Sequence, residues 1–128
     1  MKLSIYSEYA LLTLIHLARK TAGSPAAEIA TSQQIPTEIL AEILCALCQS
    51  KYVQQIEGSF CLFKNASEIS VAEIIRLFDG ALAPLEPVSS RGYAPAPMDS
   101  EEKLSGLFEQ IQIQLVKKLE NATIADVA

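Results

Sequence analysis

The stretch that decides the fold is residues 37–64, which read TEILAEILCALCQSKYVQQIEGSFCLFK. Its first half carries apolar residues at positions 39, 40, 43, 44 and 47, a spacing that predicts a helix over 37–50 with one buried face. Two short apolar runs follow at 52–56 and 60–64, separated by the turn residues Glu-Gly-Ser at 57–59. The stretch therefore predicts a helix that leads into a β-hairpin.

Upstream of this stretch the sequence predicts two more helices. Residues 3–20 are apolar on most sides, which is typical of a helix buried against several neighbours. Gly23 breaks the chain, and the Ser-Pro pair at 24–25 starts a short helix that ends at about Thr31. A turn over 32–36 then joins it to the next helix. Two helices joined by a turn and followed by a hairpin are the pattern of a winged helix, in which the hairpin is the wing.

Downstream, a capping box at Ser70 and Glu73 predicts the start of a helix that Gly80 ends. Residues 81–98 contain four prolines and are expected to be irregular. Residues 99–120 are expected to form a last helix about 30 Å long, more than a core this small covers. Its apolar stripe therefore predicts pairing with the same helix of a second chain. The stripe consists of Leu104, Leu107, Phe108, Ile111, Leu115 and Leu119.

The expected fold class is mainly α with a small β-hairpin. The 128 residues divide into a winged helix-turn-helix domain over 1–80, an irregular linker over 81–98, and a dimerisation helix with its tail over 99–128. Half of the residues are hydrophobic and the mean hydropathy is +0.25. Because a small domain has much surface for its volume, part of this apolar area is expected in a homodimer interface.

The charge of the chain is unfavourable for binding DNA. The formal net charge is −5 and the pI is about 4.8. Within residues 24–64, two lysines oppose four glutamates, which gives −2. DNA-binding domains normally carry a basic surface, because much of their affinity comes from releasing counterions at phosphates. The sequence therefore predicts that any contact with DNA is weak or atypical.

Other classes of protein find little support in the sequence. The start Met1-Lys-Leu-Ser lacks the layout of a signal peptide, and the apolar run at 10–18 is too short to span a bilayer. We therefore expect a cytoplasmic protein without membrane contact, whose cysteines are reduced thiols. The sequence shows no acid pair, nucleophile–base set or phosphate-binding glycine loop, so no enzyme activity is expected.

Several segments, in order along the chain, share one resemblance. They are Met1-Lys-Leu-Ser with Tyr9-Ala-Leu, Ile69-Ser-Val-Ala-Glu-Ile-Ile-Arg-Leu-Phe-Asp-Gly80, Ala83-Pro84, and Thr123-Ile-Ala-Asp-Val127. These resemble the Rrf-two family of bacterial winged-helix regulators, which includes the iron–sulfur cluster regulator and the cysteine-metabolism repressor. The resemblance implies a winged helix, a long dimerisation helix that crosses to the partner subunit, and DNA binding in transcription regulation.

The contact positions depart from the family pattern. Where the family has basic residues that touch phosphates, this chain has Tyr6-Ser-Glu, and its recognition helix presents Glu38 and Glu42. The family's wing is an arginine followed by a glycine- and proline-rich loop, whereas here it is the shorter Glu-Gly-Ser-Phe at 57–60. Cluster-binding members carry three cysteines ahead of the long helix, but residues 81–103 contain none. The comparison implies a regulator without an iron–sulfur cluster or other cofactor.

The candidate DNA contacts lie on the recognition helix, on the wing and at nearby lysines. Glutamates are able to accept a hydrogen bond from cytosine N4, but without adjacent basic residues they mainly repel phosphates. The alternative is a solvated helix face. Three lysine contacts would give a shallow salt dependence of about 3 ions per subunit. The candidate residues are Lys2, Thr37, Glu38, Glu42, Lys51, Glu57, Ser59 and Lys64.

The cysteines and the single histidine leave two interpretations open. Cys45 and Cys48 share a helix face, so two thiolates are able to chelate one ion, with Cys61 as a third thiol. Cysteine is, however, often a small buried hydrophobe, and we predict no metal site. His16 lies among apolar residues and is expected at the edge of the core.

The linker segment 89–93 occupies the region in which family members bind an effector. Arg91 and Tyr93 are candidates for holding a small anionic molecule, which the sequence does not identify, and the alternative is that they decorate a loop. Two functions remain open. The first is a DNA-binding transcriptional regulator without a cluster, and the second is a dimeric ligand-sensing or protein-interaction module that has lost DNA binding.

Overall fold

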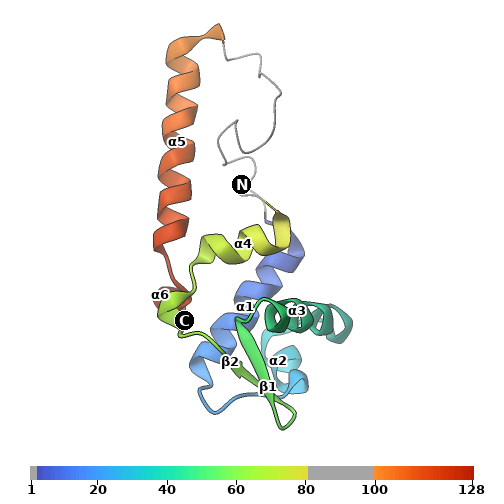
Figure 1. The fold of residues 1–128 in the computed structure, drawn as a ribbon. Coiled ribbons are helices and arrows are strands. Elements are labelled where there is room, and N and C mark those ends of the chain that lie inside the picture. Colours follow the sequence, from blue (N-terminus) through green and yellow to red (C-terminus); the bar gives the residue numbers. More distant parts are fainter. Residues whose placement is uncertain (1–2, 81–99) are drawn as a thin grey trace.

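The computed structural model describes residues 3–80 and 100–128, most of which are helical. Figure 1 shows α1 to α4 and a hairpin gathered at one end, from which α5 extends away. The fold is therefore mainly helical, with one hairpin and a long C-terminal helix, which confirms the predicted fold class. In chain order the elements are α1 (Ile5–Arg19), α2 (Ala26–Gln33), α3 (Thr37–Gln49), β1 (Val53–Ile56), β2 (Ser59–Leu62), the 3-10 helix η1 (Ala66–Glu68), α4 (Val71–Asp79), α5 (Glu102–Asn121) and α6 (Ile124–Val127).

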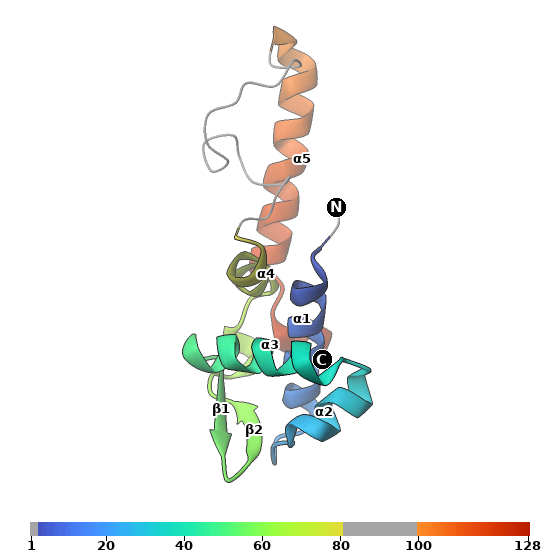
Figure 2. The ribbon, with the colours of Figure 1, turned by 90° about the vertical axis from the view of Figure 1, so that its right-hand side faces the viewer.

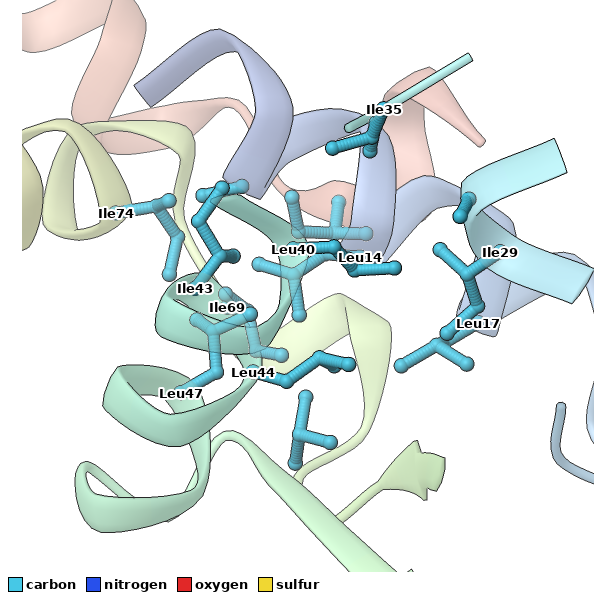
Figure 3. Close-up of a cluster of buried hydrophobic side chains, with 14 residues drawn as sticks. Leu14, Leu17, Ile29, Ile35, Leu40, Ile43, Leu44, Leu47, Ile69 and Ile74 are labelled. Atoms are coloured by element: carbon cyan, nitrogen blue, oxygen red, sulfur yellow. The ribbon is translucent and has the colours of Figure 1, made fainter. Parts of the chain in front are cut away.

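The main core lies between α1, α2 and α3 (Figure 3). Leu14 from α1, Ile29 from α2, and Ile43 and Leu47 from α3 are all fully buried. Truncating such a side chain to alanine typically costs about 2–5 kcal/mol. Because the apolar stripe of α3 is fixed in this core, the opposite face of α3 is turned towards solvent.

Helix α2 ends at Gln33, two residues later than the sequence predicted. Gln34 adopts the left-handed conformation with a φ of 56°, and its N–H donates to the Ala30 carbonyl. A left-handed residue is a common way to end a helix, but it is usually glycine or asparagine. Because a glutamine stands at this position, the sequence does not indicate where α2 ends.

The hairpin closes through a two-residue turn. Strand β1 pairs with β2 in antiparallel register, from Val53 opposite Leu62 to Ile56 opposite Ser59. Both turn residues have positive φ, 51° at Glu57 and 82° at Gly58, as the tight hairpin turns favoured by strand twist require. The predicted three-residue tip is wrong, because Ser59 already belongs to β2.

The C-terminal segment returns to the N-terminal core. The Ile124 N–H donates to the Ile69 carbonyl at 2.9 Å, and the Val71 N–H donates to the Ala122 carbonyl at 2.8 Å. Ile124 is fully buried, and Thr123 begins α6 with a capping box. The predicted capping box of α4 is also present, with Ser70 as its N-cap. The two ends of the described chain therefore share one core.

Helix α5 contributes little to that core. None of its residues, all within the described range, is buried. Near its C-terminal end, Val116 and Leu119 pack against Ala72 and Ile75 of the same chain. Its other apolar side chains are exposed. The helix begins at Glu102, with Glu101 as its N-cap, so it starts later than predicted; Asp99 itself lies outside the described residues. The exposed members of the stripe are Leu104, Leu107, Phe108, Ile111 and Leu115.

Candidate DNA-binding surface

Helix α3 presents a polar face to solvent. Its side chains at Glu38, Ala41, Glu42, Cys45 and Gln49 are exposed, whereas its apolar stripe is packed in the core. Thr37, the first residue of the helix, is also exposed. Figure 2 shows α3 lying across the front of the molecule, with the hairpin extending below it. The exposed face of α3 and the hairpin tip together form the surface that we call the reading surface.

The hairpin tip adds a further carboxylate to the reading surface. Glu57 and Gly58 are exposed, whereas Ser59 is half-buried within β2. The described part of the reading surface thus carries the glutamates at positions 38, 42 and 57. Carboxylates at these positions repel the phosphate groups of nucleic acids.

One of these carboxylates has a partner that the sequence did not reveal. The hydroxyl of Tyr6, in the first turn of α1, donates a hydrogen bond to Glu42 Oε2 at 3.0 Å. This hydrogen bond and the charge of Glu42 raise the pKa of the Tyr6 phenol above its ordinary value of 10. Periodicity within a helix gives no signal for a contact between residues 36 positions apart.

The candidate lysines lie at the base of the hairpin. Lys51 follows α3 directly and is exposed, with a positive φ of 63°. Lys64 follows β2, and its Nζ lies 5.1 Å from the centroid of the Tyr52 ring, where a cation is attracted to the aromatic face. Lys2 lies outside the described residues. Two of the three candidate lysines therefore lie among the described residues, at the base of the hairpin and not at its tip.

Tyr52 links the hairpin to the start of α4. Its hydroxyl donates to Glu73 Oε1 at 2.5 Å, and Glu73 Oε2 accepts from the Ser70 N–H at 2.9 Å. Burial and the hydrogen bond to Glu73 raise the pKa of Tyr52 to about 12. Burial alone would raise the pKa of Glu73, but the hydrogen bonds from Tyr52 and Ser70 lower it overall. The orientation of the hairpin is therefore tied to α4.

Cys45 and Cys48 share α3, whereas Cys61 lies on the hairpin. Cys45 is exposed on α3, Cys48 is half-buried against the core, and Cys61 lies on β2. Burial, and then the neighbouring Cys45, raise the pKa of the Cys48 thiol, which keeps it protonated. Across residues 3–80 and 100–128, no three His, Cys, Asp or Glu side chains are grouped closely enough to hold a metal ion.

His16 is buried rather than placed at the reading surface. Its Nε2 lies 3.1 Å from Ser24 Oγ and 3.9 Å from Glu28 Oε1. The candidate effector residues Arg91 and Tyr93 lie outside the described part of the chain. No helix in the described residues is both long and apolar enough to cross a membrane.

Comparison with solved structures places this architecture among known regulators. The structure of CymR from Bacillus subtilis, the global cysteine regulator of that organism, matches with a TM-score of 0.82. It is 24% identical and covers 100% of this chain and 96% of its own. The oxidised form of Staphylococcus aureus CymR matches with a TM-score of 0.76 at 25% identity, over 100% of this chain and 96% of its own. The IscR structure from T. potens has a TM-score of 0.72 at 20% identity, and the match covers 99% of this chain and 85% of the IscR chain.

Sequence comparison gives the same family. A Mycobacterium tuberculosis protein, named as an inferred HTH-type transcriptional regulator, is 29% identical over 134 residues, which cover 100% of this chain and 81% of the relative. The HTH-type transcriptional regulator CymR of Bacillus subtilis is 26% identical over 133 residues, which cover 100% of this chain and 90% of that regulator. Residues 3–128 match the Rrf2 family, described as an iron-dependent transcriptional regulator. The match over residues 3–128 therefore assigns this chain to the Rrf2 family of transcriptional regulators, the Rrf-two family that its motifs resemble, and the solved structures share its fold.

Proposed function

We propose that this chain is a homodimeric transcriptional regulator that binds DNA weakly and without an iron–sulfur cluster. The single observation that carries the weak contact is the exposure of Glu38, Glu42 and Glu57 on the reading surface. Counterion release at phosphates requires basic side chains. The candidate lysines among the described residues, Lys51 and Lys64, lie at the base of the hairpin and not at its tip.

The proposed dimer rests on α5. The helix exposes an apolar stripe that includes Leu107, at 54% exposure, and Phe108, at 45%. Water contact of this stripe is unfavourable by roughly 25 cal/mol for each Å² of apolar surface. A second copy of the same helix is the occupant that the family resemblance and the chain's high apolar content favour.

The proposed absence of a cluster rests on the cysteines. Iron–sulfur clusters are held mainly by cysteine thiolates. The chain has only three cysteines, and residues 81–103 contain none of them. Cys45 and Cys48 lie on α3 and Cys61 lies on β2, so the side chains present do not fit a cluster.

The alternative function is a dimeric ligand-sensing or protein-interaction module that has lost DNA binding. The same glutamates favour it, because three carboxylates oppose the approach of any polyanion. The two functions differ in one measurable property, which is sequence-dependent retention of DNA.

A selection from a random-sequence DNA duplex library at low salt tests the proposal. The full-length protein is expected to enrich a pseudo-palindromic site, as a symmetric dimer requires. Its affinity for that site is expected to fall only gradually as the salt concentration rises, with the release of about 3 ions per subunit. Glu57→Arg is expected to strengthen retention, whereas Glu109→Arg on α5 changes the net charge equally and is the control. Absence of any enriched site would favour the alternative module.

Brown colour and bound iron after anaerobic purification would contradict the cluster-free part of the proposal. That measurement is independent of DNA binding, so each part of the proposal is tested separately.

A further inference from the structure

The hydrogen bond between Tyr6 and Glu42 joins two helices across the reading surface. Tyr6 belongs to the first turn of α1, and Glu42 lies in the middle of the exposed face of α3. An exposed glutamate normally samples several side-chain rotamers. A donor on a second helix, 3.0 Å from Oε2, restricts that sampling and gives the carboxylate a preferred position.

The neighbouring carboxylate reinforces this position. Glu38 lies four residues before Glu42 on the same helix face, and like charges at this spacing repel each other. Glu38 has no tyrosine hydroxyl donating to it among the contacts of the described residues. Repulsion from Glu38 and attraction by Tyr6 therefore act together on the Glu42 side chain.

An ionised carboxylate accepts hydrogen bonds and donates none. The Tyr6 hydroxyl uses one lone pair of Oε2, so Glu42 keeps acceptor capacity for a further donor. In the DNA major groove, cytosine presents its N4 amino group as a donor, whereas adenine presents its N6 amino group beside the N7 acceptor. A fixed carboxylate is compatible with cytosine and is repelled by the N7 of adenine.

We infer that Tyr6 is a positioning residue that holds Glu42 to accept a hydrogen bond from the N4 amino group of a cytosine in the major groove. The inference rests on the proposed DNA-binding function, to which it adds a base preference and the residue that sets it.

The experiment repeats the library selection with the wild type, Tyr6→Phe, Glu42→Gln and the control Glu109→Gln, which removes the same charge from an exposed position on α5. The wild type is expected to enrich cytosine at one position of each half-site. Glu42→Gln is expected to shift that position towards adenine, with which glutamine pairs. Tyr6→Phe is expected to lower the preference for cytosine about fivefold, the effect of one hydrogen bond, while the salt slope stays unchanged. Glu109→Gln is expected to keep the cytosine preference.

A DNA duplex with 2-pyrimidinone in place of that cytosine isolates the amino group. On this duplex, Tyr6→Phe and the wild type are expected to bind equally, because the group that Glu42 contacts is missing. Tyr6 and Glu42 are both exposed, so thermal unfolding by circular dichroism is expected to show that the variants remain folded.

The outcomes separate the inference from the proposed function. A wild type that enriches a site without a preferred cytosine overturns the inference and leaves the DNA-binding function intact. The same conclusion follows if Tyr6→Phe weakens binding equally for all sequences, as loss of a phosphate contact would, or changes nothing. A wild type that enriches no site overturns both.

Discussion

Ser24 and Phe60 exchange both of their backbone hydrogen bonds. The Ser24 N–H donates to the Phe60 carbonyl at 2.9 Å, and the Phe60 N–H donates to the Ser24 carbonyl at 2.8 Å. The loop after α1 therefore adds an antiparallel bridge to the outer side of β2. The hairpin is therefore joined to the loop after α1 by this bridge, and the contact of Tyr52 with Glu73 joins its start to α4.

Gly23, directly before this bridge, is expected to be intolerant of a side chain. Its φ is 91°, and a Cβ added there would stand 3.2 Å from the Phe60 carbonyl oxygen, which β pairing prevents from moving. Gly58 has a φ of 82° but open space around the corresponding position. Gly58→Ala is expected to lower the free energy of unfolding by about 1 kcal/mol through backbone strain alone. Gly23→Ala is expected to cost at least about 1 kcal/mol more. Urea titration of both variants measures the difference, and equal losses would show that the Phe60 carbonyl yields.

His16 is expected to make stability depend on pH. Burial lowers the pKa of His16 below 6.5, although the charge of Glu28 acts in the opposite direction. The folded state therefore favours the neutral imidazole. Its contribution to the free energy of unfolding is complete above pH 6.5 and is lost as the pH falls through the lower folded pKa. Urea unfolding between pH 8 and pH 5 measures this loss.

His16→Gln is the matched variant for that measurement, because glutamine retains hydrogen-bonding groups near Ser24 and does not titrate. The decline of stability between pH 7 and pH 5 is expected to be shallower in His16→Gln. An equally steep decline would mean that other groups cause it.

Tyr52→Phe is expected to reduce stability through loss of the hydroxyl. The hydrogen bond to Glu73 is part-exposed, so the expected cost is at the lower end for a charged partner, about 1.5 kcal/mol at pH 7. Since the folded pKa of Tyr52 is about 12, this contribution is present below pH 10 and disappears between pH 10 and pH 12. The control is Tyr6→Phe, which removes the fully exposed hydroxyl–carboxylate pair and is expected to have the smaller effect. Chemical denaturation at pH 7 compares the two, and the reverse order would contradict the assigned role of Tyr52.

Phe108→Glu is expected to convert the proposed dimer to a monomer. A charge in the centre of the apolar stripe of α5 would be buried without a partner, and disrupting such an anchor residue typically costs more than about 2 kcal/mol of binding free energy. The control is Gln110→Glu, which adds the same charge at an exposed polar position of the helix. Sedimentation velocity at micromolar concentration distinguishes the states. A wild type that sediments as a monomer would remove the basis of the prediction.

The sequence was sufficient for features that depend on local periodicity and capping. The stripe from Leu40 to Leu47, the capping box at Ser70 and the stop at Gly80 all stand where they were expected. The errors occurred where the backbone conformation is unusual for the residue. The left-handed Gln34 and the positive φ of Glu57 are uncommon for residues other than glycine, so they displaced the predicted ends of α2 and the hairpin tip.

The contacts between helices at the candidate site could not be predicted from the sequence. Tyr6 and Glu42 are far apart in the chain and are joined only because α1 and α3 cross in the packed core. The same limitation applies to Leu119, which the stripe of α5 assigned to a partner subunit but which packs against Ala72 of its own chain. Helical spacing identifies which residues share a face, and it does not identify what covers that face.

The short strand-like contact between Ser70 and Thr123 has a consequence for how the protein is made. Ile69 and Ile124 occupy the same buried region, so a nascent chain that has reached only the end of α4 exposes the unfilled side of Ile69 to water. During translation, the buried region around Ile69 is expected to stay incomplete until residue 124 has left the ribosome. Chaperone contact and proteolytic cleavage of the emerging polypeptide are expected to be concentrated in that interval.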